Sequence, residues 1–214
     1  FGPFKKRGHN TSALVLENFA KEAINLDKES YGGELLQKVI NIDGQDVQFC
    51  FLKLEVFWDL SSAIILSEAS RFKPDLILMM GEGYEGEIMI ESTARNKNSK
   101  SNGYNYMGQE KEINTPQSFL LMDRKSNANT FEKMTWDFEE IYKETKGLMK
   151  NAPENLVLNL ANGHRKKNIY ICNAVSFTTL HSLKNKPLYL FKDELLMKPS
   201  FDQRIKAGFL HLPK

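Results

Sequence analysis

Cys172 is the residue best placed for chemistry. It follows the short apolar run Ile169-Tyr-Ile171 and precedes a helical pattern at residues 173–183. In α/β proteins, ligands bind at the carboxyl ends of strands, where the next helix begins. A helix amino terminus favours the thiolate, which is the nucleophilic form of cysteine, through its dipole and its free N–H groups. The position fits a reactive thiolate and a small buried hydrophobic residue equally well.

A thiol nucleophile needs a base, and the four histidines are not equal candidates for it. His181 lies on the same expected helix as Cys172, too far along it to reach back. His9 and His164 lie in polar segments that are typical of surface loops. His211 interrupts an apolar, strand-like run near the end of the chain, where a histidine packed into the core is the alternative.

Glu91 is a carboxylate that could orient such a histidine, because it directly follows the apolar run 88–90. If buried, it would need a charged partner such as a protonated histidine or an arginine; the alternative is an ordinary surface acid. Glycines 81, 83 and 86 precede it, but their spacing matches neither a dinucleotide-binding loop nor a Walker loop. Glu82 and the neighbouring acids would repel phosphate, so the sequence argues against a nucleotide site.

The elements that must position these residues alternate between strand and helix patterns. Short apolar runs bounded by breakers are typical of buried parallel strands, and they occur at residues 47–51, 76–80, 156–158 and 169–171. Helical patterns occur at residues 12–26, 60–72, 136–150 and 173–183. The alternation predicts an α/β fold, in which one domain over residues 1–214 has a mixed, twisted sheet flanked by helices on both faces. Residues 96–130 are rich in asparagine and predict a long irregular or mobile segment.

The composition and the net charge limit the classes of protein to which this chain can belong. A chain of 214 residues with a net charge of +2 and 41% hydrophobic residues is an ordinary globular protein with enough length for a core. Its two cysteines make no disulfide framework, so we expect a reducing compartment, the cytoplasm. Cys50 lies in a hydrophobic run, where we expect a buried thiol. No apolar run approaches the ~20 residues of a membrane span and no signal sequence opens the chain, so we expect no membrane partner. The two short basic runs are typical of solvated loops, so we expect no nucleic-acid partner.

Four blocks occur in one order over nearly the whole chain. They are Phe1-Gly-Pro-Phe4 with Asn10 behind it, Glu91-Ser-Thr-Ala-Arg-Asn96, Tyr170-Ile-Cys-Asn173 and Gly208-Phe-Leu-His-Leu-Pro213. These blocks resemble the motifs G-F-G-P-F-G-G, E-R-V-A-I-N, Y-x-C-N and G-F-I-H-V-P of the pyroglutamyl peptidases. Members of this family, also called pyrrolidone-carboxylate peptidases, are cysteine peptidases that remove pyroglutamate from the amino terminus of peptides.

The resemblance implies that Cys172 is the nucleophile, that His211 acts as general base and then acid, and that Glu91 orients the imidazole. It implies a peptide with a blocked amino terminus as the partner, and neither a metal nor an organic cofactor. A homo-oligomer is compatible with it. The residues that the resemblance assigns to the pyroglutamyl ring are Phe1, Phe4, Asn10, Tyr170, Ile171 and, through its backbone, Glu82.

The chain also departs from the family pattern. The segment A-R-I-P-D-N is not recognisable at residues 97–103, and the basic segment at 164–167 resembles an insertion. The outer blocks lie at the very ends of the sequence, so we expect a chain trimmed at both ends. These departures leave an alternative open, which is a divergent relative that cleaves another small amide or only binds blocked peptide ends.

Overall fold

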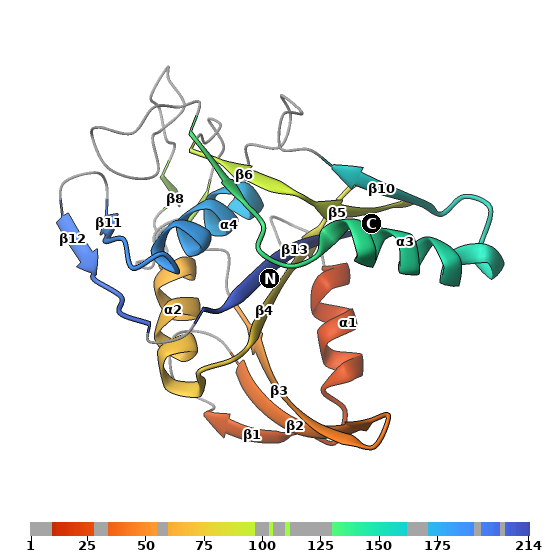
Figure 1. The fold of residues 1–214 in the computed structure, drawn as a ribbon, viewed down its shortest axis with the longest axis horizontal. Coiled ribbons are helices and arrows are strands. Elements are labelled where there is room, and N and C mark those ends of the chain that lie inside the picture. Colours follow the sequence, from red (N-terminus) through yellow and green to blue (C-terminus); the bar gives the residue numbers. More distant parts are fainter. Residues whose placement is uncertain are drawn as a thin grey trace. The chain divides into compact units, whose positions relative to one another are not determined.

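The computed structural model describes residues 10–27, 34–54, 60–96, 103–104, 110–111, 130–161, 171–190, 194–201 and 204–214 (Figure 1). Contacts group the chain into two compact units, Phe1–Val56 and Phe57–Lys214. Within the described residues, no helix has the length and apolar character that a membrane crossing requires.

The amino-terminal unit contains one helix and an antiparallel sheet of order β1-β2-β3. Helix α1 (Thr11–Phe19) begins at Asn10, whose side chain accepts a hydrogen bond from the N–H of Ser12 at 3.0 Å. Asp43 and Gly44 join the last two strands with φ angles of 51° and 83°, the left-handed conformations that a tight hairpin turn requires. The strands are β1 (Ile24–Asp27), β2 (Glu34–Ile42) and β3 (Gln45–Lys53).

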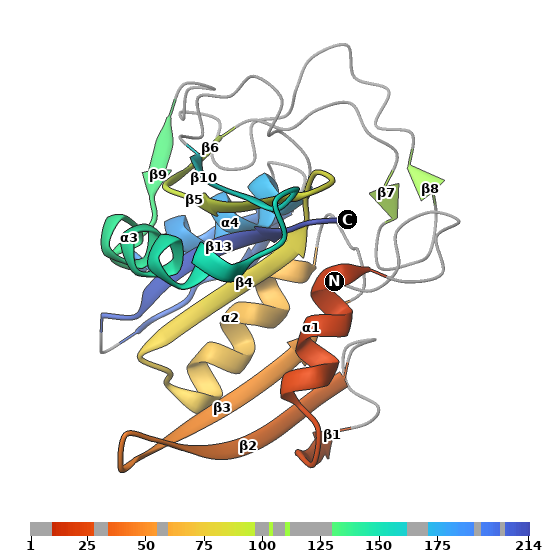
Figure 2. The same ribbon diagram turned by 90° about the vertical axis from the view of Figure 1, so that its right-hand side faces the viewer.

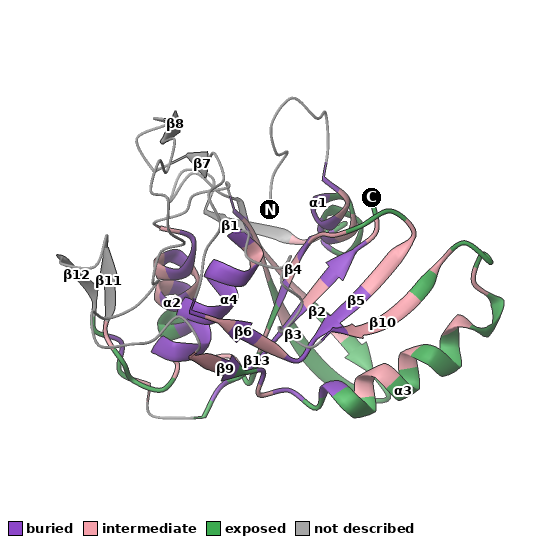
Figure 3. Cartoon of the chain, turned by 90° about the horizontal axis from the view of Figure 1, so that it is seen from above, coloured by how far each residue is buried: buried purple, intermediate pink, exposed green. Residues whose placement is uncertain are grey.

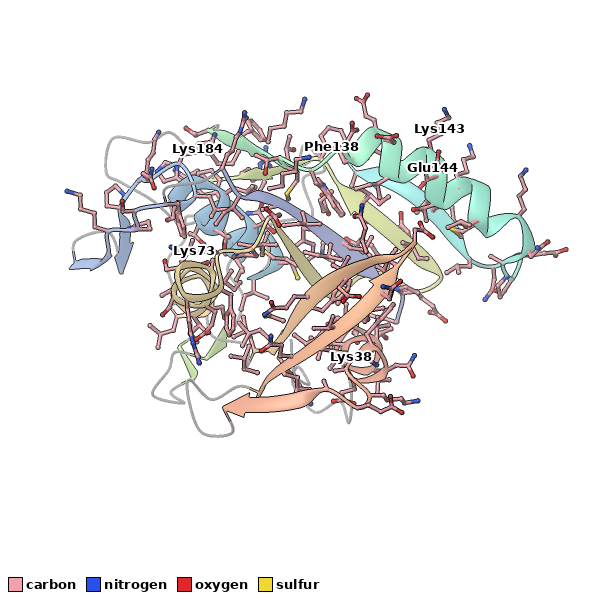
Figure 4. The ribbon with its side chains drawn as sticks, turned by 60° about the horizontal axis from the view of Figure 1, so that its bottom comes forward. Lys38, Lys73, Phe138, Lys143, Glu144 and Lys184 are labelled. Atoms are coloured by element: carbon pink, nitrogen blue, oxygen red, sulfur yellow. The ribbon has the colours of Figure 1, made fainter. Side chains whose placement is uncertain are left out.

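Side chains fasten α1 to the sheet of this unit, and Figure 2 shows the helix alongside the strands. Lys53 of β3 pairs with Glu17 of α1 at 2.5 Å. The ammonium group of Lys38, labelled in Figure 4, donates a hydrogen bond to the carbonyl oxygen of Lys21 at 2.7 Å. Both contacts join residues that are distant in sequence, so they hold the unit together.

Three predictions for this unit are wrong. The expected helix 12–26 ends at Phe19, because Glu22 adopts a left-handed conformation (φ 65°) and the chain then enters β1. The expected strand at 47–51 exists, but it pairs antiparallel with β2 instead of lying in a parallel sheet. Cys50 is exposed instead of buried. An apolar run does not by itself distinguish a buried parallel strand from one strand of a hairpin.

The carboxy-terminal unit is built on a four-stranded mixed sheet of order β10-β5-β13-β4. Strand β13 runs parallel to β4 on one side and antiparallel to β5 on the other, and β10 runs parallel to β5. This arrangement confirms the predicted α/β class with a mixed sheet. The strands are β4 (Leu76–Glu82), β5 (Glu87–Glu91), β10 (Val157–Ala161) and β13 (Lys206–Leu212).

Helices α2 (Ser61–Phe72), α3 (Phe138–Leu148) and α4 (Ile171–Ser182) surround this sheet, and a 3-10 turn (Met149–Asn151) follows α3. Helices α2 and α4 pack on each other, and the hydroxyl groups of Ser62 and Thr178 share a hydrogen bond between them. Figure 3 shows α4 buried along nearly its whole length and α3 largely exposed. On α3, Lys143 and Glu144 are exposed to solvent (Figure 4).

Helices lie on both faces of the sheet. Cys172 at the start of α4 faces the side of the sheet that carries Phe209. Trp136, just before α3, packs against Gly208, which is the preceding residue of the same strand. Because successive residues of a strand face opposite sides, α4 and the segment leading into α3 cover opposite faces.

Three short strand pairs complete the unit. They are β6 (Thr93–Arg95) with β9 (Phe131–Lys133), β7 (Gly103–Tyr104) with β8 (Glu110–Lys111), and β11 (Leu188–Leu190) with β12 (Glu194–Met197). Most of the segment 96–130 that we expect to be irregular lies outside the described residues. The sequence predicts a strand at 169–171, but Ile171 is the first residue of α4, so the prediction is wrong at that residue. Residues 162–170 lie outside the described part of the chain. That residues 1–214 form one trimmed domain stays a prediction.

Candidate active site

The sulfur of Cys172 lies at the amino-terminal end of α4, where the cysteine is the second helical residue. The first turn of a helix has backbone N–H groups without partners inside the helix, and these favour a negative charge. The sulfur lies directly over Gly81 of β4. A Cβ atom placed on Gly81 would be 2.9 Å from Sγ and 3.0 Å from Cζ of Phe209, so the absence of a side chain there leaves room for the thiol.

His211 and Glu91 meet because β13 lies between β4 and β5 in the sheet. Nδ1 of His211 lies 3.0 Å from Oε1 of Glu91, and the two side chains are separated by 120 positions in the sequence. Glu91 ends β5, opposite Phe209, and its side chain reaches along β13 to the imidazole. Both residues are buried, with His211 7% exposed and Glu91 2% exposed. Glu91 is therefore not an ordinary surface acid, which is the alternative that the sequence leaves open.

The imidazole of His211 hydrogen-bonds Cys172 as well as Glu91. Burial by itself lowers the pKa of His211, but the hydrogen bonds that the ring donates to Cys172 and Glu91, together with the negative charges of these groups, raise the pKa to about 10. At neutral pH the imidazole is therefore protonated. Because Nδ1 faces Glu91, Nε2 is the nitrogen that remains for the sulfur.

A sulfur, an imidazole and a carboxylate thus form a continuous hydrogen-bonded chain. In this order the carboxylate fixes the ring orientation, the ring stabilises a thiolate, and the thiolate is a nucleophile. The ring of Phe209 lies 4.8 Å from the His211 ring at an angle of 52°, so it supports the imidazole from the same strand. The arrangement is suited to nucleophilic attack followed by proton transfer.

Three of the other six predicted site residues lie in the described part of the chain. Ile171 is the buried first residue of α4, directly before the cysteine. Glu82 ends β4 between Gly81, which faces the sulfur, and Gly83, on which a Cβ would lie 2.9 Å from that of His211. Asn10 is buried in the amino-terminal unit, where it caps α1. The remaining three, Phe1, Phe4 and Tyr170, lie outside the described residues.

His181 faces away from this site, as the sequence predicts. Its Nδ1 lies 2.9 Å from Oε1 of the buried Glu132 on β9. Lys184, which Figure 4 labels, binds the other oxygen of the same carboxylate. Burial alone raises the pKa of Glu132, but the hydrogen bonds from His181 and Lys184 and their charges lower it overall. The cluster fastens β9 to the carboxyl end of α4.

Sequence reasoning did not single out three contributors to the site. Gly81 marks the end of an apolar run, but nothing local shows that a sulfur lies over it. In the sequence, nothing distinguishes Phe209 from an ordinary core residue. Asn173 stands in the Y-x-C-N block, yet its contacts become visible only in the fold: its side chain binds the backbone of Arg95.

Across the described part of the chain, no group of three or more histidine, cysteine or acidic side chains has an arrangement that could hold a metal ion.

The fold is of the α/β class, and the site combines a thiol, an imidazole and a carboxylate. The chain is similar to a solved structure of pyroglutamyl peptidase I from Bacillus amyloliquefaciens. The superposition has a TM-score of 0.58 at 16% sequence identity, and it covers 100% of this chain and 77% of the other. At this identity the likeness shows the shared fold. No protein-family model and no curated protein sequence matches the chain.

Proposed function

We propose that this protein is a cysteine peptidase that removes pyroglutamate from the amino terminus of peptides. The observation that supports the proposal most strongly is the hydrogen-bonded chain from Cys172 through His211 to Glu91. Its members belong to three of the four sequence blocks that resemble the pyroglutamyl peptidases. The fold shared with pyroglutamyl peptidase I is consistent with the same assignment.

In the first half of the reaction, the thiolate of Cys172 attacks the carbonyl carbon of the pyroglutamyl residue and forms a C–S bond. The carbonyl oxygen then carries a negative charge, which the backbone N–H groups at the start of α4 are oriented to stabilise. When this tetrahedral intermediate collapses, the C–N bond breaks and protonated His211 gives its proton to the leaving amine. The products are a thioester on Cys172 and a peptide shortened by one residue.

In the second half, neutral His211 takes a proton from a water molecule, and the resulting hydroxide attacks the thioester carbonyl. The C–S bond breaks, free pyroglutamate leaves, and the thiolate and the imidazolium are restored. Glu91 keeps its hydrogen bond to Nδ1 throughout, so that Nε2 always faces the reacting atoms. No cofactor enters this sequence of steps.

The substrate in this proposal carries an uncharged, flat lactam ring. The backbone of Glu82, between two glycines at the sulfur and the imidazole, is a source of main-chain hydrogen bonds for the lactam. Phe1, Phe4, Asn10, Tyr170 and Ile171 are proposed as ring contacts on the strength of the family resemblance. A thiolate nucleophile must stay reduced, which is why we also propose a reducing compartment such as the cytoplasm.

The test is hydrolysis of pyroglutamyl-aminomethylcoumarin by the purified protein and by the Cys172→Ala and Cys172→Ser variants. We expect hydrolysis by the wild type and none by either variant. Cys50→Ala is the matched control, because Cys50 lies on β3 of the other unit, and this variant should keep the wild-type rate. Activity retained in Cys172→Ala would refute the proposal.

A panel of other aminoacyl-aminomethylcoumarins tests the substrate class. The proposal expects a kcat/KM for the pyroglutamyl reporter that exceeds those of alanyl, prolyl and glutaminyl reporters by at least about 10²-fold. Equal values across the panel would leave a thiol hydrolase whose substrate is another small amide.

A further inference from the structure

The side chain of Asn173 makes two hydrogen bonds to the backbone of Arg95. Its Oδ1 accepts from the N–H of Arg95 at 2.9 Å, and its Nδ2 donates to the carbonyl oxygen of Arg95 at 3.0 Å. Asn173 is only 3% exposed, and it belongs to the first turn of α4. Its carboxamide therefore bonds the edge of β6 as the peptide group of a neighbouring strand would. Of the side chains of this size, only a carboxamide both donates and accepts in this way.

This clamp connects the two chain segments that carry the reacting groups. Asn173 directly follows Cys172, so any shift of its backbone moves the sulfur. Arg95 lies at the end of β6, just beyond Glu91 at the end of β5. Between them, Ser92 is held by two hydrogen bonds to the carbonyl of Ala161, from its N–H at 2.9 Å and its hydroxyl at 3.0 Å. The carboxylate end of the site is thus anchored, and Asn173 ties the sulfur end to it.

We propose that Asn173 is a positioning residue that holds the sulfur of Cys172 within hydrogen-bonding reach of His211. Its relevance to catalysis rests on the proposed peptidase function, but its effect on the sulfur does not. The geometry supports this assignment because the clamp lies in the first turn of α4, next to Cys172, where its loss lets the helix end move. A displacement of about 1 Å at a reacting atom costs on the order of 10²-fold in rate.

The experiment compares Asn173→Leu and Asn173→Ala with the wild type. Leucine keeps roughly the volume of asparagine but has no hydrogen-bonding groups, whereas alanine removes the volume as well. The control is Asn185→Gly, since Asn185 makes the same kind of clamp to the backbone of Phe201, at 2.8 Å and 3.5 Å, beyond the other end of α4. Asn185 has a φ angle of 59°, which glycine adopts without strain, so only the clamp is lost.

The readout that needs no substrate is the alkylation rate of Cys172 by iodoacetamide at pH 6 and pH 9, followed by peptide mapping. An isolated thiol reacts on the order of 10²-fold faster at pH 9 than at pH 6. A sulfur within hydrogen-bonding reach of an imidazole is more reactive at low pH than an isolated thiol, so the wild-type ratio should be clearly smaller than that of an isolated thiol. We expect both Asn173 variants to approach the ratio of an isolated thiol and Asn185→Gly to keep the wild-type ratio.

The second readout is hydrolysis of the pyroglutamyl reporter. Both Asn173 variants should lose on the order of 10²-fold in kcat with less than a threefold change in KM. A wild-type alkylation ratio in Asn173→Leu and Asn173→Ala would overturn the proposal. Loss of cooperative melting in both variants would also overturn it, because Asn173 would then only stabilise the fold. If the wild type itself cleaves no reporter, the peptidase proposal fails while the alkylation comparison still decides the role of Asn173.

Discussion

Replacing Gly81 by alanine tests whether the sulfur of Cys172 occupies a fixed place in the site. The new methyl group would lie 2.9 Å from Sγ and 3.0 Å from Cζ of Phe209. Favourable contacts between carbon atoms occur at about 3.5–4.0 Å, so both contacts are at least about 0.5 Å too short. Phe209 is 1% exposed and packed on all sides, so the strain falls mainly on the cysteine at the end of its helix.

The expected magnitude follows from these two contacts. Inserting a methyl group into a well-packed site costs about 1–3 kcal/mol of unfolding free energy. For a chain of this length each kcal/mol lowers Tm by about 2–4 °C, so we expect a fall of about 2–12 °C. If the sulfur is displaced by nearly 1 Å, kcat should fall on the order of 10²-fold. The loss of activity should therefore be much larger than the loss of folded protein at 25 °C.

The assay combines thermal melting with hydrolysis of the pyroglutamyl reporter and alkylation of Cys172. Gly147→Ala is the matched control, because Gly147 lies inside α3 and a Cβ there would meet nothing within 4 Å. That variant should gain about 0.5–1 kcal/mol of stability, since alanine favours the helix, and its kcat should not change. A Gly81→Ala protein with wild-type kcat and wild-type alkylation would refute the reasoning, because the sulfur would not be confined by β4.

Three further predictions follow from the same structure. Glu91→Gln removes the charge behind the imidazole, so kcat should fall by ~10²–10⁴-fold with a smaller change in KM; an equal change in both would assign Glu91 to substrate binding. The pKa of His211, raised from 6.5 to about 10, contributes stability that is fully present below pH 6.5 and lost as the pH rises towards 10. The difference in unfolding free energy between the wild type and His211→Gln, measured in urea, should therefore shrink from pH 6 to pH 10, and a constant difference would contradict the ion pair. Gly208→Ala would place a Cβ inside the ring of Trp136, so it should abolish cooperative melting, whereas a normal Tm would show that the ring can move aside.

The sequence by itself predicted the class of fold and several of the elements that carry the reacting residues. The helix predicted at 60–72 is α2, and the helix predicted after Cys172 is α4, because periodic apolar residues and breakers act over only a few turns. For the same reason the apolar run around His211 is a strand. Motif resemblance then singled out Cys172, His211 and Glu91 together, although no local pattern links them.

Only the tertiary structure decided which of these residues meet. Glu91 reaches His211 because β13 lies beside β5, a pairing between segments 120 residues apart that depends on the whole sheet. The clamp from Asn173 to Arg95 spans 78 residues, and the hydrophobic pattern of neither segment predicts it. The same limit explains the errors at Cys50 and Ile171, since burial and the end of a strand depend on which partner packs against a segment. Local pattern specifies what an element is, whereas long-range packing specifies which elements lie side by side, and a catalytic site needs both.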